Sequence, residues 1–154
     1  TYNLEQHWQI QRMVNRLKIK YNIKHKGEMK MIDFNNSKFV KLKPIDANQI
    51  IKTVGDLLID GEQIVYSFQA MRDSVVFTDK RVISINVQGL TGTKKDFTSL
   101  PYSKVQAYSV ETAGLMDLDA ELELWFSGLG KVKFEFTSGC DIYGLEKMLS
   151  YHIL

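Results

Sequence analysis

The sequence predicts a mainly β domain of the α+β class, a seven-stranded barrel capped by a carboxyl-terminal helix, with a helical extension at the amino terminus. Seven short strand-like runs follow one another between residues 61 and 136. Several of them place an apolar residue at every second position, as half-buried strands do. Frequent turns between such short strands are typical of a barrel or sandwich. The final fifteen residues then change to the apolar spacing of a helix.

The first thirty residues differ from the rest of the chain in charge. They contain seven basic and two acidic residues, a net +5, whereas the rest contains 13 basic and 16 acidic residues, a net −3. Such asymmetry is typical of an arm beside a folded body. The arm also carries a helical apolar stripe, and we interpret residues 1–30 as a basic amphipathic extension. The stripe consists of Leu4, Trp8, Ile10, Met13, Val14, Leu17 and Tyr21.

Residues 31–60 are expected to form a linker and a second amphipathic helix. Residues 35–45 form an extended lead-in, because Pro44 disfavours helical conformation in the residue before it. Asp46 can cap a helix over residues 47–59, which Asp60 and Gly61 would close. Its apolar stripe is Ile50, Ile51, Val54, Leu57 and Leu58.

The barrel with its final helix is expected over residues 61–154. The predicted strands span residues 62–70, 74–78, 81–87, 94–100, 105–112, 118–126 and 131–136. In the sixth, Leu118, Ala120, Leu122, Leu124 and Phe126 share one face. Asp141 can cap the last helix, whose apolar face is Ile142, Leu145, Met148, Leu149, His152 and Ile153.

Size and composition suit one soluble domain. The chain has 154 residues, 44% of them hydrophobic, and no apolar run of the roughly 20 residues that a spanning helix needs. The amino terminus lacks the apolar core of a signal peptide, and the single Cys140 cannot form an internal disulfide. We therefore expect a cytoplasmic protein.

Four segments of the sequence, called its phrases below, resemble those of one known family. They are GEQIVYSFQAMRDSVVFTDKRVISINVQGLTGTK (61–94), LPYSKV (100–105), VETAGLMDLDAELELWFSG (110–128) and GCDIYGLEKML (139–149). Over about residues 45–154 the chain is similar to the bacterial pleckstrin-homology-like domain family. The resemblance implies a pleckstrin-homology-like barrel of two near-orthogonal sheets and a tendency toward ring-shaped homo-oligomers, and it does not imply an enzymatic activity. Superfolds alone do not determine function.

The first hairpin departs from the pattern of lipid-binding pleckstrin-homology domains. Those domains bind inositol phosphates through several Lys and Arg side chains, which phosphates require. Here the loop holds Arg72 beside Asp73. The sequence therefore favours a turn residue over a phosphoinositide site.

An acidic row that begins just before the sixth predicted strand and continues into it could coordinate a hard cation. Its second half, however, is expected to face Lys131 and Lys133 across the Gly128 hairpin, as opposite charges on neighbouring strands do. Ion pairing is therefore the favoured interpretation. The row is Asp117, Asp119, Glu121 and Glu123.

Nothing in the sequence indicates catalysis, a metal or a cofactor. His7, His25 and His152 share no neighbourhood with one another or with Cys140. Cys140 precedes a helix start, which could lower its pKa, although a small residue at a cap boundary is the simpler account. We expect a protein that is not an enzyme.

Interaction residues are the remaining candidates. Trp125 projects from the polar face of its strand, where an interface and local cover are both open interpretations. Trp8, Met13 and Leu17 of the arm are the other expected protein-interface residues. The expected anionic contacts are Arg12, Arg16, Lys18, Lys20, Lys24 and Lys26.

The favoured function is a non-catalytic interaction and oligomerisation module. It would form a homo-oligomer, with a ring as one form that the resemblance suggests, and recruit a protein partner. The alternative is a peripheral binder of anionic membranes or anionic ligands that uses the basic arm. Outside the arm the chain has no excess of positive charge, so no specific nucleic acid is expected.

Overall fold

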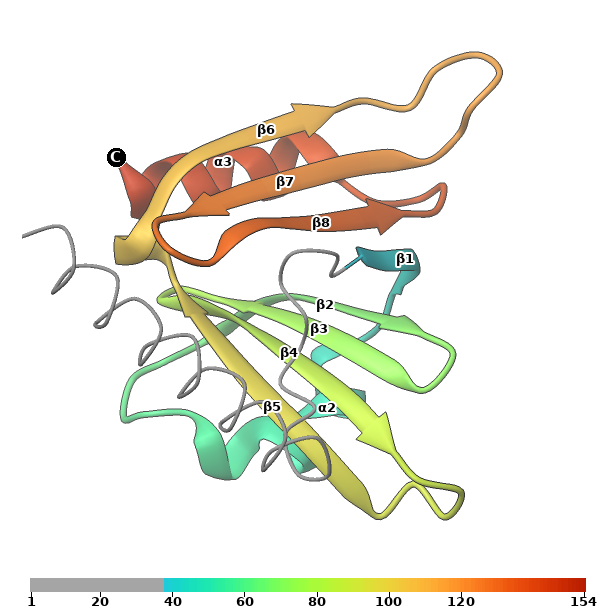
Figure 1. Ribbon diagram of the computed structural model, residues 1–154, viewed down its shortest axis with the longest axis vertical. Helices are drawn as coiled ribbons and strands as arrows, with labels where there is room; N and C mark the ends of the chain where they lie inside the picture. Colours follow the sequence, from blue (N-terminus) through green and yellow to red (C-terminus); the bar gives the residue numbers. More distant parts are fainter. Residues whose placement is uncertain (1–37) are drawn as a thin grey trace, which may run out of the picture. The chain divides into compact units, whose positions relative to one another are not determined.

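The computed structural model describes residues 38–154, which hold eight strands and two α-helices (Figure 1). The predicted arm, with Trp8, Met13, Leu17 and its basic residues, lies outside the described residues. The strands are β1 (Lys38–Pro44), β2 (Ile64–Ala70), β3 (Asp73–Thr78), β4 (Arg81–Gln88), β5 (Lys94–Pro101), β6 (Val105–Glu111), β7 (Ala120–Phe126) and β8 (Gly130–Phe136). The α-helices are α2 (Ala47–Val54) and α3 (Ile142–Ile153), and 3-10 turns span η1 (Gly55–Leu57) and η2 (Tyr102–Lys104).

All eight strands belong to one continuous sheet of order β5-β4-β3-β2-β1-β8-β7-β6. Figure 1 shows two groups, β2–β5 and β6–β8, with β1 between them and α3 along the second group. β1 pairs antiparallel with β2 and parallel with β8, whereas the neighbouring strands of each group pair antiparallel. This is the mainly β barrel with a carboxyl-terminal helix that the sequence predicted.

β1 corrects one expectation, because residues 35–45 were predicted as an extended lead-in outside the seven strands. The structure makes Lys38–Pro44 an eighth strand that joins the two groups. Its partner β8 lies near the other end of the chain, with Phe39 opposite Phe134. Local periodicity carries no information on such a distant pairing.

The main core lies between the two groups of strands and α3. Phenylalanine rings form its centre, and those of Phe68 and Phe136 have centroids 4.6 Å apart. Leu145 and Leu149 of α3 are fully buried in the same cluster. A second cluster lies on the other face of β3 and β4, where Ile50 and Val54 of α2 belong with Val76, Ile83 and Ile85.

The alternation of β7 is confirmed with a later start. Ala120, Leu122, Leu124 and Phe126 are buried, and the residues between them are half-buried on the other face. Leu118, predicted on the buried face, is 61% exposed and precedes the strand. The reason is a turn in which the N–H of Gly114 donates to the carbonyl of Asp117 at 2.6 Å.

Both predicted helix caps are confirmed. The Asp46 carboxylate accepts from the N–H of Asn48 at 2.7 Å, and that of Asp141 accepts from the N–H of Gly144 at 3.0 Å. The helix predicted over residues 47–59 is shorter in the structure, because α2 ends at Val54 and a 3-10 turn begins at Gly55. Among the described residues no helix is long and apolar enough to cross a membrane.

Candidate functional site

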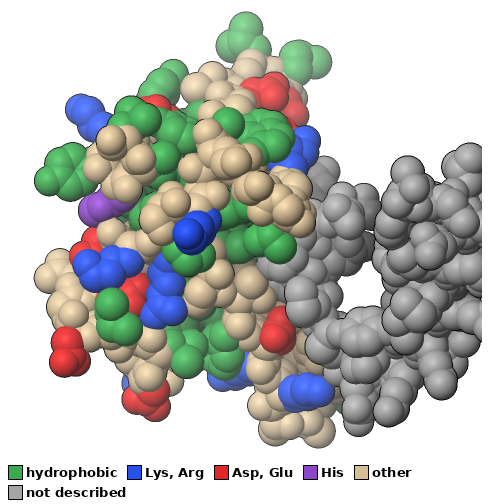
Figure 2. Space-filling model, turned by 60° about the vertical axis from the view of Figure 1, so that its left-hand side comes forward, with side chains coloured by type: hydrophobic (Ala, Val, Ile, Leu, Met, Phe, Trp, Pro, Cys, Tyr) green, Lys and Arg blue, Asp and Glu red, His purple; other side chains and the backbone are tan. Residues whose placement is uncertain are grey.

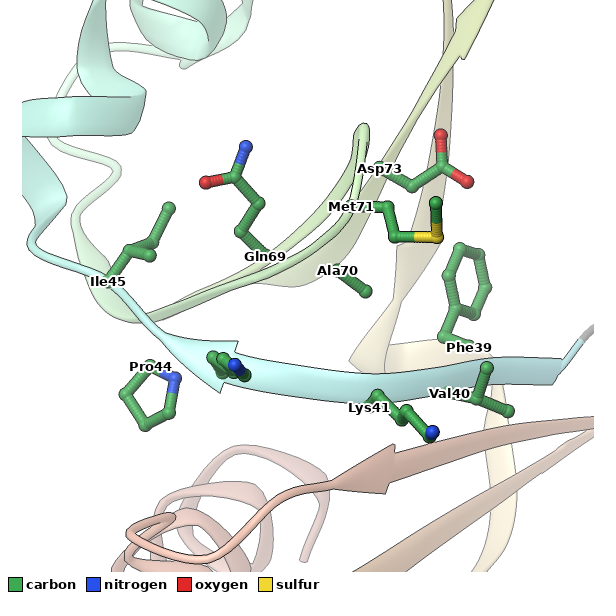
Figure 3. A pocket seen from close by; sticks show the side chains of 10 residues that line it. Phe39, Val40, Lys41, Pro44, Ile45, Gln69, Ala70, Met71 and Asp73 are labelled. Atoms are coloured by element: carbon green, nitrogen blue, oxygen red, sulfur yellow. The ribbon is translucent and has the colours of Figure 1, made fainter.

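A cleft of about 600 Å³ lies between β1 and the end of β2 with its turn into β3. Figure 3 shows the side chains of Phe39 and Met71 on the same side of β1, close to Asp73. The cleft is lined by Phe39, Val40, Lys41, Lys43, Pro44, Ile45, Gln69, Ala70, Met71 and Asp73.

The cleft exists because β1 changes partner along its length. Lys38, Phe39 and Leu42 are in register with β8, whereas in the described part of the chain the residues of β1 in register with β2 are Lys43 and Pro44. The pairing with β8 contains a register shift between Phe39 and Leu42, where Lys41 has φ of 56°. Bulges of this kind bend a strand and interrupt its ladder. The bend separates the start of β1 from Ala70 and leaves space between them.

The cleft combines apolar walls with a cationic rim. Val40 is 40% exposed and Met71 is 98% exposed, so both are accessible to a ligand. Lys41 and Lys43 are exposed on β1. The one carboxylate, Asp73, accepts from the N–H of Val87 at 3.0 Å and is therefore engaged within the fold. These groups suit binding of an apolar segment with nearby negative charge.

The first hairpin turn is held by Arg72. Its guanidinium donates to the carbonyl of Gly89 at 2.6 Å, which ties the β2–β3 turn to the loop after β4. Met71, at the tip, has φ of 48°, a conformation that residues with a Cβ rarely adopt. Arg72 thus acts as a turn residue, as the sequence favoured.

The second half of the acidic row forms the ion pairs that the sequence favoured. Glu123 pairs with Lys131 at 2.7 Å, and Glu121 pairs with Lys133 on the same face of the β7–β8 hairpin. Among the described residues no group of three or more His, Cys, Asp or Glu side chains could hold a metal ion.

Cys140 is half-buried beside the start of α3. Burial, together with the negative charge of Asp141, raises the pKa of its thiol to about 11. The suggestion that the helix start lowers this pKa is therefore wrong, because desolvation disfavours the thiolate. His152 stacks on Tyr102 with ring centroids 5.9 Å apart, while His7 and His25 lie outside the described residues.

Trp125 lies half-buried on the outer face of β7. It is in register with Ala107 and Lys131, and the Lys131 ammonium lies 5.8 Å from the ring centroid. This cation–π contact provides part of the local cover that the sequence left open. An interface role for the remaining surface stays a prediction.

A buried polar network is the feature that sequence reasoning missed. The Glu62 side chain is fully buried, and Arg81 binds both of its carboxylate oxygens at 2.9 Å. The Thr78 hydroxyl donates to the same carboxylate at 2.8 Å, and the Tyr102 hydroxyl donates to the Thr78 carbonyl at 2.7 Å. The available signal was that Glu62, Thr78, Arg81 and Tyr102 all lie in the phrases 61–94 and 100–105.

The network holds Glu62 as a carboxylate. Burial alone would raise the pKa of Glu62, but hydrogen bonds from Arg81, from the N–H of Ile59 and from Thr78 outweigh it and lower the pKa to about 2. Arg81 also donates to the Leu57 carbonyl at 2.7 Å. The network therefore connects the turn after α2 to β3 and β4, and it is a structural centre.

The comparisons with known proteins agree with this architecture. The family model described as "Bacterial PH domain" matches residues 33–153. The uncharacterized protein YjqA of Bacillus subtilis (strain 168) is 45% identical over 96 residues, which cover 61% of this chain and 77% of YjqA.

Two solved structures have the same fold. The chain is 35% identical to a DUF1696 family protein with a pleckstrin-homology domain from Shewanella loihica PV-4, with a TM-score of 0.66 over 75% of this chain and 99% of that one. It is 37% identical to a pleckstrin homology domain from Shewanella amazonensis SB2B, with a TM-score of 0.55 over 71% and 90%. With a family model matching residues 33–153, this chain belongs to the bacterial PH domain family.

Proposed function

We propose that this chain is a non-catalytic interaction module of the bacterial PH type, which binds a protein partner in the cleft beside β1 and associates with further copies of itself. The cleft carries the proposal, because it joins exposed apolar side chains to a rim of two lysines. A cytoplasmic location belongs to the same proposal and is supported by the single cysteine.

The ionisable side chains that could take part in chemistry are paired within the fold or held neutral, which supports a binding role. Glu62 and Arg81 bind each other in the interior, and Glu121 and Glu123 form ion pairs with lysines of β8. Cys140 is held in its neutral thiol form by burial at neutral pH. These groups serve the fold and leave the cleft to bind by shape, apolar contact and charge.

The partner that fits the cleft is an extended peptide segment with apolar residues and at least one acidic residue. Its apolar side chains would contact Phe39, Val40 and Met71, and its carboxylate would approach Lys41 or Lys43. A bent strand beside an open space also offers backbone groups to an added strand, a common way in which sheets bind peptides.

The test compares the proteins that co-purify with the unchanged chain, with a variant of the cleft and with a control variant. Val40→Glu combined with Met71→Glu places negative charge in the cleft, whereas Val65→Glu changes an exposed position of β2 that does not line it. Proteins captured by the unchanged chain and by Val65→Glu, but lost with the double variant, support the proposal. Equal capture by all three, at equal melting temperatures, contradicts the assignment to this cleft.

A second candidate is binding to anionic membranes, which the net +5 of residues 1–30 favours. Attraction to an anionic surface contributes about 1 kcal/mol per basic residue and weakens with salt. Flotation with vesicles containing phosphatidylserine tests it, with phosphatidylcholine vesicles as the control. Recovery of the chain in the unbound fraction at low salt would eliminate this candidate.

A further inference from the structure

Two residues that line the cleft beside β1 have an unusual backbone conformation. Among the described residues other than glycine, Lys41 and Met71 are the two with positive φ, at 56° and 48°. A Cβ makes this conformation costly, whereas glycine adopts it readily. Met71 lies in the two-residue turn between Ala70 and Asp73, where glycine or asparagine is the usual choice. Both positions therefore hold a long side chain where the backbone favours glycine.

The same two residues lie where the pairing between β1 and β2 ends. Lys43 is in register with Gln69. Two residues further, the same register would place Lys41 opposite Met71. A left-handed residue does not continue an extended strand, so the ladder between the two strands stops there. The cleft of about 600 Å³ lies beyond this point, and its volume is within the usual range of ligand sites.

The bulge at Lys41 changes the direction of its side chain. Neighbouring side chains of a regular strand point to opposite sides, which would place Lys41 on the side of Phe39. Figure 3 shows instead that Lys41 lies beside Val40 on one side of β1. Phe39 lies with Met71 on the other side. Bulges re-aim side chains in this way next to binding sites. We call Phe39 and Met71 the apolar wall, and Val40 and Lys41 the cationic wall.

Lys41 is available to bind a negative charge. It is exposed and has no ion pair within residues 38–154. Lys131 and Lys133, by contrast, pair with glutamates of their own hairpin. On the face drawn in Figure 2, Lys and Arg side chains are interspersed with Asp and Glu, so this face has no broad field of one sign. Recognition of charge in the cleft therefore depends on its own unpaired lysines, of which Lys41 belongs to the cationic wall.

We propose that the cleft binds its peptide as an added strand and that Lys41 selects the charge of that peptide. This inference rests on the proposed function and specifies how the peptide is recognised. Successive side chains of a strand point to opposite sides, so one residue contacts the apolar wall and the next contacts the cationic wall. The ligand is an extended segment in which an acidic residue directly adjoins an apolar one. A helical ligand would space its contact residues three or four positions apart.

Selection of a phage-displayed library of random peptides on the full chain measures this preference. Peptides selected by the unchanged chain should carry an acidic residue next to an apolar one. Lys41→Glu should select Lys or Arg in place of the acidic residue. It should also bind the acidic peptides roughly tenfold more weakly, because repulsion replaces attraction. Lys147→Glu changes an exposed lysine of α3 that does not line the cleft, and this matched control should select the same peptides as the unchanged chain.

The variant Lys41→Gly separates recognition from folding. Glycine adopts the positive φ without a Cβ, and the substitution removes the charge. The melting temperature should therefore equal or exceed that of the unchanged chain, while the selected peptides lose the acidic residue and keep the apolar one. A lowered melting temperature together with an unchanged acidic preference would mean that Lys41 serves the fold alone, and would overturn the inference.

The outcomes distinguish this inference from the proposed function. The inference is overturned if Lys41→Glu selects the same acidic peptides as the unchanged chain, or if the acidic and apolar residues are three or four positions apart. The proposed peptide site stands in that case when the peptides no longer bind the variant with Val40→Glu and Met71→Glu. If the library yields no binding peptide, or if the peptides bind that double variant equally well, both the inference and the proposed site are overturned.

Discussion

Acid should destabilise this protein through Glu62, and replacing that residue should remove the effect. The pKa of Glu62 is about 2 in the folded chain, against an ordinary value of 4.5. A carboxylate with a lowered folded pKa stabilises the fold above its unfolded pKa, and this contribution is lost as the pH falls. The loss should therefore begin near pH 4.5 and be nearly complete near pH 2.

The size of the effect follows from the difference between the two pKa values. At about 1.4 kcal/mol per pKa unit, a lowering from 4.5 to about 2 corresponds to roughly 3 kcal/mol of unfolding free energy. This is a large share of the 5–15 kcal/mol that holds a typical domain folded. The Glu62 side chain is fully buried and the Arg81 side chain is 22% exposed, so solvent screens the pair only in part.

The assay is urea denaturation of the unchanged chain and of Glu62→Gln between pH 7 and pH 3. At pH 7 the variant should be less stable by roughly 3 kcal/mol, because Arg81 loses its anionic partner. The difference between the two proteins should shrink as the pH falls. The pKa of Asp79 is also lowered, mainly by the N–H of Gln63, so only the difference between the proteins isolates Glu62. A difference that stays constant across this range would refute the reasoning.

Three further predictions concern the core, the buried polar network and the Cys140 thiol. Leu122→Asp or Phe134→Asp should prevent folding, because each buries an unpaired carboxylate at a cost of several kcal/mol. The control Glu121→Gln should lower the unfolding free energy by less than about 1 kcal/mol. Circular dichroism compares the variants, and equal loss of structure in all of them would mean that the faces of β7 are misassigned. Tyr102→Phe should lower the unfolding free energy by about 1 kcal/mol, because it removes the 2.7 Å hydrogen bond to the Thr78 carbonyl. Denaturant titration measures this free energy, and an unchanged value would show that the hydrogen bond contributes nothing to stability. Cys140 should react with iodoacetamide at pH 8 roughly a hundredfold more slowly than a free cysteine does, because its raised pKa leaves little thiolate. Reaction at the rate of free cysteine would contradict the burial of the thiol.

Local features of this fold could be predicted from the sequence because neighbouring residues produce them. The alternation of β7 places Leu122 and Leu124 inside, and the period of two in the sequence indicates this directly. The caps at Asp46 and Asp141 involve N–H groups two and three residues away. The pairing of Glu121 with Lys133 across the Gly128 hairpin is likewise set by a short turn.

The candidate site could not be predicted in this way. The cleft depends on the pairing of β1 with β8 along Lys38–Leu42 and with β2 at Lys43 and Pro44, and both partners are distant in the sequence.

The sequence by itself determined the class of the fold, most strand positions, both helix caps and, through its four phrases, the family. Tertiary structure alone decided the eighth strand, the cleft and the meeting of Glu62, Arg81 and Tyr102. The physical reason is range: periodicity and capping act over a few residues of backbone, whereas strand pairing and burial join segments that only the folded chain brings together.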